Sequence, residues 1–257
     1  MRLYYSQCAV PENRGEGAWE EEMNAEMPKT ILLYRFLDAA AALKTIESRQ
    51  FRISRLRDLN DPFEWRFGYK GHHPEDETIF NTWRESVSES QNKVRGIICF
   101  SATSKEPVLW SHYADKHTGV AFEVDCINDP KLLKKISYPP ERVAIDIPTF
   151  AQLQHDEVSL KKYLGPIMEQ MIQQKSPSWA YEKEYRFNIE FEKVANLQFS
   201  NGHYALPIPD DFLTRVILGW KCPLEVQYVL KALHTVGLTS TKVVRAKISP
   251  DSYEVLC

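Results

Sequence analysis

The sequence predicts an α+β protein, because apolar runs typical of buried strands alternate with segments whose apolar residues recur at helical spacing. Buried or alternating strands are expected at residues 31–36, 95–101 and 184–191. The clearest helical spacing covers 156–174, with a kink expected at Gly165-Pro166. Hydrophobic residues make up 43% and charged residues 26% of the 257 residues, as in ordinary globular domains.

The remaining elements follow from local signals along the chain. Asp38 is expected to cap a helix whose apolar residues lie on one face, and the Asn-Asp-Pro sequence within 58–64 indicates a polar loop. Residues 136–138 and 143–145 are expected to form a strand pair. Further strands are expected at 51–56, 120–125, 216–219 and 243–248, and further helices at 76–92, 107–115 and 223–236. Residues 30–257 therefore form one predicted domain, and residues 1–29 an N-terminal appendage.

Composition restricts the classes of function. A net charge of −3 argues against a broad nucleic-acid-binding surface. The five cysteines include no C-x-x-C pair, which indicates reduced thiols and a cytoplasmic protein and argues against a structural zinc site. No apolar run approaches the roughly 20 residues that span a bilayer, and the N-terminus lacks the layout of a signal peptide.

Two expected strands carry polar groups at positions where clefts form. Tyr34 and Arg35 interrupt the apolar strand 31–36, and a buried Arg requires a partner, either an ion pair at the sheet edge or a ligand. Ser101 ends the strand 95–101 and begins a run of hydroxyl residues. Helix capping explains such hydroxyls as well as ligand binding does, and no G-x-S-x-G motif marks Ser101 as a nucleophile.

The segment 179–186 is the strongest candidate for a functional centre. Glu182 and Glu184 are two residues apart, so in a strand they share a face, and their mutual repulsion raises one of the two pKa values. Arg186 lies on the same face and is expected to pair with them. Structural ion pairing explains this arrangement without function, but Trp179 and Tyr181 would form one wall of a pocket around an acid.

Two other places carry weaker signals. His112 and His117 are five residues apart, which is not the i, i+4 spacing that places two ligands on one helix face, so no metal site is expected. The loop containing Asn60, Asp61 and Glu64 lacks the ligand density of a calcium loop, and its Asn and Asp are expected to stabilise a turn.

Together these segments resemble a bacterial domain family of unknown function. The shared pattern is L-N-D-P-F-E, F-S, W-S-H-Y-A-D-x-H-x-G and W-x-Y-E-x-E-Y-R, found here at residues 59–64, 100–101, 110–119 and 179–186. The resemblance extends from about residue 31 to 250. It does not by itself supply a function.

The order strand–Arg, strand–Ser-x-Thr-Ser and Glu-x-Glu is also similar to the signature of ADP-ribosyltransferases of the DNA-modifying toxin type. This resemblance implies a split β-sheet core with flanking helices and NAD as substrate, with no metal. It implies that Glu184 contacts the ribose 2′-hydroxyl, that Arg35, beside Tyr34, contacts a phosphate or ribose, and that Ser101 holds the ribose or orients Glu184.

The same resemblance implies that Trp110 or Tyr113 stacks on nicotinamide and that Glu182 faces the acceptor as general base. One departure concerns the stacking residue, because the Trp-Ser-His-Tyr motif belongs to the first family and not to well-known transferases. Six further residues are expected to support this predicted site: Asn60, Asp61, Glu64, His112, Trp179 and Arg186.

Three functions thus fit the sequence. The first is an NAD-dependent ADP-ribosyltransferase, a toxin or phage-defence effector that modifies a nucleic acid or a protein. The second is a non-catalytic nucleotide-binding or ligand-binding domain, in which the Glu/Arg cluster is structural. The third is a nuclease or phosphotransferase that uses His112 and nearby acids.

Overall fold

The computed structural model describes residues 30–71, 74–127, 129, 132–194, 197–200 and 202–257. The predicted N-terminal appendage, residues 1–29, lies outside the described residues, so that prediction remains a prediction. Within the described part no helix is long and apolar enough to cross a membrane. The four cysteines found there, at positions 99, 126, 222 and 257, are all free.

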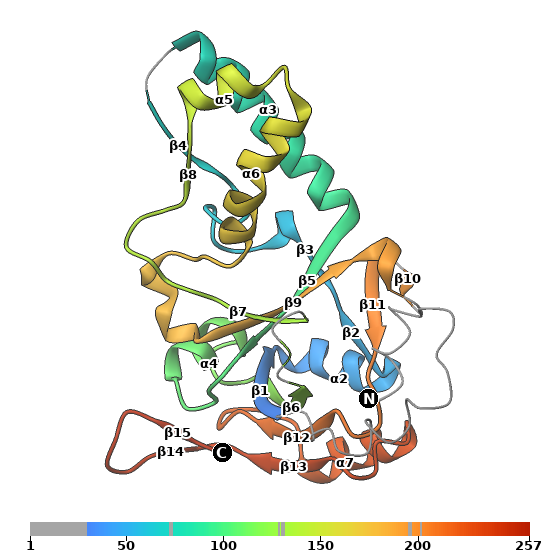
Figure 1. Cartoon of the computed structure of the whole chain (residues 1–257). Helices are drawn as coiled ribbons and strands as arrows, with labels where there is room; N and C mark the ends of the chain where they lie inside the picture. Colours follow the sequence, from blue (N-terminus) through green and yellow to red (C-terminus); the bar gives the residue numbers. More distant parts are fainter. Residues whose placement is uncertain (1–29, 72–73, 128, 130–131, 195–196, 201) are drawn as a thin grey trace, which may run out of the picture.

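A mixed sheet of eight strands forms the centre of the fold (Figure 1). Only β12 and β13 pair in parallel within it, and the other pairs are antiparallel. In spatial order the strands are β13 (Lys242–Arg245), β12 (Leu213–Leu218), β6 (Val120–Ile127), β1 (Thr30–Leu37), β5 (Arg95–Ser101), β9 (Glu184–Glu190) and β7 (Leu133–Lys135), and β3 (Ser54–Arg55) pairs with β5.

The sheet opens between β1 and β5. β1 pairs with β6 along its whole length, but it pairs with β5 only where Tyr34 lies opposite Ser101. β5 in turn pairs with β9 along its whole length, ending with Ser101 opposite Glu184. The α+β class is therefore confirmed, and the predicted likeness to the ADP-ribosyltransferase core remains a prediction.

Helices cover this sheet and extend beyond it (Figure 1). They are α2 (Ala39–Ser48), α3 (Pro74–Val94), α4 (Pro107–Tyr113), α5 (Ile147–Leu153), α6 (Glu157–Ile172) and α7 (Val226–Thr235), with 3₁₀ turns η2 (Leu56–Asp58), η3 (Pro177–Glu182) and η4 (Phe191–Lys193). In Figure 1, α3, α5 and α6 gather at the end opposite β12, β13 and α7. Separate apolar clusters fill these two regions, one around Phe122 and Val216 and one around Phe80 and Phe150.

Three small sheets complete the architecture, and one of them corrects a prediction. They are β10 (Gln198–Ser200) with β11 (His203–Pro207) and β2 (Gln50–Arg52), β14 (Lys247–Ile248) with β15 (Val255–Leu256), and β4 (Gly68–Lys70) with β8 (Ala144–Asp146). Residues 136–138 and 143–145 do not pair with each other: Ser137 forms a bridge with Gln174, and residues 144–145 belong to β8, which pairs in parallel with β4. The proline pair at 139–140 separates them, and each finds a partner elsewhere.

Local sequence accounts for the elements that border the site. Asp38 caps α2 as predicted, since its carboxylate accepts a hydrogen bond of 2.7 Å from the Ala41 amide. The turn from α4 to β6 contains three consecutive residues with positive φ, at positions 115–117. Gly119 ends this turn, and a Cβ there would lie 2.2 Å from the carbonyl oxygen of Leu37. Only glycine fits where this turn passes the end of β1.

Candidate functional site

A pocket of about 280 Å³ lies where β1 and β5 separate. Strand β1 contributes Arg35, β5 contributes Ser101, and β9 contributes Glu184 to its lining. The 58–64 loop, α4 and η3 supply further walls. Three neighbouring strands therefore bring the three residues singled out from the sequence into one cavity.

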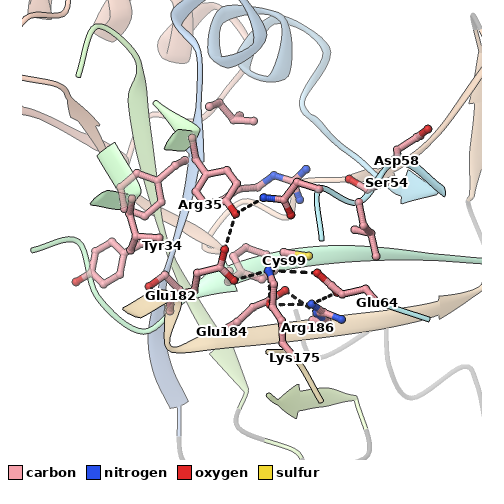
Figure 2. A pocket seen from close by; sticks show the side chains of 18 residues that line it. Tyr34, Arg35, Ser54, Asp58, Glu64, Cys99, Lys175, Glu182, Glu184 and Arg186 are labelled. Carbon is pink, nitrogen blue, oxygen red and sulfur yellow. Dashed lines mark hydrogen bonds and ion pairs between the residues drawn. The ribbon is translucent and has the colours of Figure 1, made fainter. Parts of the chain in front are cut away.

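Lys175 occupies the centre of a buried ionic cluster in this pocket (Figure 2). Its ammonium lies 2.6 Å from a Glu182 carboxylate oxygen, 3.2 Å from Glu64 and 3.5 Å from Glu184. Arg186 completes the cluster: its Nε and Nη2 donate to the two oxygens of Glu184 at 2.5 and 2.7 Å, and it also pairs with Glu64. These five side chains are only 1–6% exposed. We call them the ionic cluster.

The two predicted acids reach the ionic cluster by different routes. β9 begins at Glu184, whereas Glu182 is the last residue of η3. Lys183 between them adopts a left-handed φ of 46°, so the shared face of a strand is not what brings the two acids together. A helical turn and a strand instead converge on Lys175.

Burial and pairing move the three carboxyl pKa values in different directions. Burial raises the pKa of Glu182, although Lys175 and a hydrogen bond from Tyr113 oppose it. Burial likewise raises the pKa of Glu64 against the pull of Arg186 and Lys175. Burial also disfavours ionised Glu184, but Arg186 outweighs it and lowers the pKa of Glu184 below its ordinary value. The ionised form is therefore most favoured at Glu184, whereas Glu64 and Glu182 hold a proton more readily than an ordinary carboxyl group does.

Neutral groups hold the segment around Glu182 in place. The Tyr113 hydroxyl donates to Glu182 and accepts a 2.7 Å hydrogen bond from the Asn60 side chain. The Ser101 hydroxyl donates to the Glu182 carbonyl oxygen at 2.6 Å. Ser101 thus positions the backbone of Glu182, and Asn60 links the 58–64 loop to α4 through Tyr113.

Replacing Tyr113 with phenylalanine is expected to lower the free energy of unfolding by about 1–3 kcal/mol, because Glu182 then lacks a buried donor. Urea denaturation followed by circular dichroism measures this change. Tyr228→Phe is the matched control, since Tyr228 is exposed on α7. Equal stability of the two variants would show that the Tyr113 hydrogen bond contributes nothing.

Arg35 lies across the pocket from Lys175 and Arg186 (Figure 2). Its Nη2 donates to the Arg52 carbonyl oxygen at 2.9 Å, and its guanidinium lies 5.5 Å from the centre of the Phe51 ring. Its Nη1 is buried and has no hydrogen-bond partner. Burial lowers the pKa of Arg35 to about 10, so the side chain stays cationic at neutral pH. A buried donor without an acceptor is costly, and a bound anion would satisfy it.

Two residues predicted to contact a ligand do not turn their polar groups into the pocket. Trp110 is 0% exposed, and its ring nitrogen donates to the Ser104 carbonyl oxygen, so it cannot stack on a ligand in this structure. The Tyr34 ring borders the pocket, but its hydroxyl points away to Glu123 (Figure 2). Strand alternation explains this, since neighbours such as Tyr34 and Arg35 face opposite sides.

The aromatic residues beside Glu182 form a surface cluster outside the pocket lining. The His112 ring nitrogen lies 3.1 Å from the Tyr181 hydroxyl, and the Trp179 ring lies 6.1 Å from that of Tyr181. Trp179 also lies under the Lys175 ammonium, 4.6 Å from it. His112 does not line the pocket, and the hypothesis of a nuclease or phosphotransferase that uses His112 remains a prediction.

The 58–64 loop divides its predicted supporting residues between two roles. Asp61 stabilises a turn, as expected, by accepting a 2.9 Å hydrogen bond from the Phe63 amide. Glu64 instead enters the ionic cluster. Within the described ranges no group of three or more His, Cys, Asp or Glu is arranged to hold a metal ion.

Sequence reasoning missed Lys175, Cys99 and Tyr138. Cys99 lies opposite Arg186 on β5 and lines the pocket, and the Tyr138 hydroxyl accepts a 2.8 Å hydrogen bond from the Glu184 amide. Lys175 follows a run of glutamines and belongs to no motif. One signal pointed to it: the two acids Glu182 and Glu184 beside a single Arg186 leave one negative charge without a cation.

Comparison with known proteins adds one finding. A family model described as a protein of unknown function (DUF2971) matches residues 109–187. The matched segment includes residues 109–113 of α4 and also Glu182, Glu184 and Arg186, which supports the resemblance to an uncharacterised domain family. No curated protein and no solved structure matches the chain.

Proposed function

We propose that this protein cleaves NAD and transfers ADP-ribose to a macromolecular acceptor, a nucleic acid or a protein. The observation that carries the proposal is the convergence of Arg35, Ser101 and Glu184 from three neighbouring strands on one pocket. The opening of the sheet between β1 and β5 also agrees with the split core that the sequence resemblance implies. A role as toxin or phage-defence effector remains a prediction.

Glu184 suits the bond-breaking step. When the bond between ribose C1′ and the nicotinamide nitrogen breaks, its electron pair leaves with the nitrogen and positive charge develops on the ribose. A firmly ionised carboxylate beside the ribose stabilises this charge. Arg186 keeps Glu184 ionised and holds both of its oxygens, which fixes its orientation.

Glu182 suits the transfer step. As an oxygen or nitrogen of the acceptor bonds to C1′, it loses a proton, and ionised Glu182 can take that proton. Its raised pKa makes it a stronger base than an ordinary carboxylate. The two acids therefore have the separated pKa values that divided roles require.

Arg35 is proposed to bind the diphosphate of NAD through its unpartnered Nη1. Replacing Arg35 with methionine keeps the apolar stem and removes the charge, so affinity is expected to fall about 10- to 100-fold. Calorimetry with carba-NAD, which a methylene in place of the ribose ring oxygen protects from cleavage, measures this change. Arg52→Met is the control, because Arg52 is exposed on β2 and holds Arg35 only through its backbone. Equal affinity of the two variants would contradict the assignment.

The function is tested with NAD labelled separately on nicotinamide and on adenylate, mixed with DNA, RNA and protein acceptors. Release of free nicotinamide with the adenylate label retained on an acceptor is the expected result. The activity is expected to be lost in Glu184→Gln and kept in Glu190→Gln, a change on the same strand outside the pocket. Intact NAD after incubation with every acceptor would overturn the proposal.

Non-catalytic ligand binding is the second candidate. The ion pairs of Glu64, Glu182 and Glu184 favour it, since each acid already lies within ion-pair distance of Lys175 or Arg186. Binding of NAD without cleavage by the wild-type protein would establish this function in place of the first.

A further inference from the structure

The ionic cluster contains more acids than bases. Three carboxylates, Glu64, Glu182 and Glu184, face two cations, Lys175 and Arg186, so the fully ionised cluster has one excess negative charge. All five side chains are buried, and an uncompensated buried charge is costly. The empty pocket is therefore expected to hold a proton in this cluster, and a cationic ligand can replace it.

The other titratable groups that face the cluster do not compensate this charge. Tyr113 approaches from α4 and Cys99 from β5, and Tyr138, in the segment after β7, accepts a hydrogen bond from the Glu184 amide. Burial raises the pKa of the Tyr113 hydroxyl and the Cys99 thiol and raises the pKa of Tyr138 to about 12, so all three are neutral near pH 7. The remaining charged side chains that line the pocket are Arg35 and the exposed Asp58.

The pocket is consequently bipolar. The ionic cluster forms an acidic end, and Arg35, across the cavity from Lys175, forms a cationic end with a buried unpartnered donor (Figure 2). A ligand with both charges would satisfy both ends. An uncharged or wholly anionic ligand would leave the acidic end with its proton or its excess charge.

We propose that this pocket selects zwitterionic ligands, binding the positively charged nicotinamide ring at the ionic cluster and a phosphate at Arg35, and discriminates against neutral analogues of that ring. The choice of nicotinamide rests on the proposed function. The charge selectivity rests on the cluster itself and applies whether or not the protein cleaves NAD.

Proton release accompanies this binding. Burial raises the pKa of both Glu64 and Glu182, so either of them can hold the proton of the empty pocket. A bound cation favours the ionised carboxylate and expels that proton. Affinity for the cation therefore rises with pH up to the raised carboxyl pKa and levels off above it, while affinity for a neutral analogue lacks this increase.

Two non-cleavable dinucleotides test the inference by calorimetry. Carba-NAD carries the cationic pyridinium ring, and benzamide adenine dinucleotide carries a neutral ring of the same shape joined through carbon. Carba-NAD is expected to bind about tenfold tighter or better, and to release protons seen as a dependence of the heat on buffer ionisation. Equal affinities, tighter binding of the neutral compound, or binding of neither would overturn the proposal.

A variant shows whether the preference for carba-NAD comes from the ionic cluster or from the net charge of the protein. Glu64→Gln removes the excess charge and keeps the side-chain shape, so the preference for carba-NAD is expected to fall to about twofold or less. Binding of the benzamide compound reports that the variant is folded. Glu190→Gln alters the net charge equally, outside the pocket, and is expected to keep the wild-type preference. A Glu64→Gln variant with the wild-type preference for carba-NAD would contradict the inference.

The two proposals can fail separately. If the wild-type protein cleaves NAD but binds the two analogues equally, the proposed charge selectivity is wrong and the proposed transferase function stands. If it binds carba-NAD more tightly than the benzamide compound but does not cleave NAD, the site is charge-selective and the proposed transferase function is wrong.

Discussion

Replacing Arg186 with methionine is expected to lower the free energy of unfolding by about 3–5 kcal/mol, the cost of removing one partner from a buried ion pair. Arg186 is 1% exposed and pairs with both Glu184 and Glu64. Without it, the three acids share the single ammonium of Lys175. Equilibrium urea denaturation at neutral pH measures the loss.

Arg95→Met is the matched control for this change. Arg95 lies on β5 and pairs with Glu190 on β9 at 3.1 Å, but both side chains are about one-third exposed. Exposed pairs contribute little, so the expected loss is about 1 kcal/mol or less. A loss for Arg186→Met no larger than this would show that the ionic cluster does not stabilise the fold.

The effect of Arg186 also has a defined pH dependence. Because Arg186 lowers the pKa of Glu184, the pair contributes stability above the ordinary carboxyl pKa and loses it as pH falls through the lowered pKa. In the variant, protonation of Glu184 removes a buried charge. The stability difference between wild type and Arg186→Met is therefore expected to shrink as pH falls below about 4, the ordinary range of carboxyl groups.

The elements that were predictable from sequence are those set by local chemistry. The strand 95–101 matches β5, and the strand at 31–36 lies within β1, because short apolar runs between polar turns leave few alternatives. Asp38 marks the start of α2 for the same reason, since a capping carboxylate acts within one helical turn. Where the partner of a segment is distant in sequence, as for residues 136–138 and 143–145, the local pattern predicted the wrong pairing.

The candidate site was predictable in part for a related reason. Glu182, Glu184 and Arg186 lie within one short segment, so their meeting could be argued from sequence, although the geometry differs from a simple strand. Lys175 and Glu64 are 111 residues apart and meet only because the 58–64 loop lines the same pocket as Lys175. The predicted stacking role of Trp110 could not be checked from sequence, because an aromatic residue in a motif is equally typical of a core and of a binding surface. In the structure Trp110 belongs to the core.

Replacing Glu184 with glutamine is expected to lower the rate of NAD cleavage about 100- to 1,000-fold, the range for removal of one preorganised electrostatic contact. The amide keeps the shape of the carboxylate but cannot balance positive charge on the ribose. Initial rates of nicotinamide release at saturating NAD measure the effect.

Folding of the Glu184→Gln variant follows from the same count of charges. The change leaves Glu64 and Glu182 facing Lys175 and Arg186, so the buried cluster becomes balanced and its unfolding midpoint is expected to stay near that of wild type. A folded variant with a wild-type rate would remove Glu184 from the reaction. Collapse of the fold, together with NAD left intact by the wild-type protein, would instead assign the acid a structural role. In Arg186→Met the same cluster instead gains an unbalanced charge, so its stability is expected to fall. Comparing the two variants therefore separates the effect of Glu184 on the reaction from the effect of the cluster on stability.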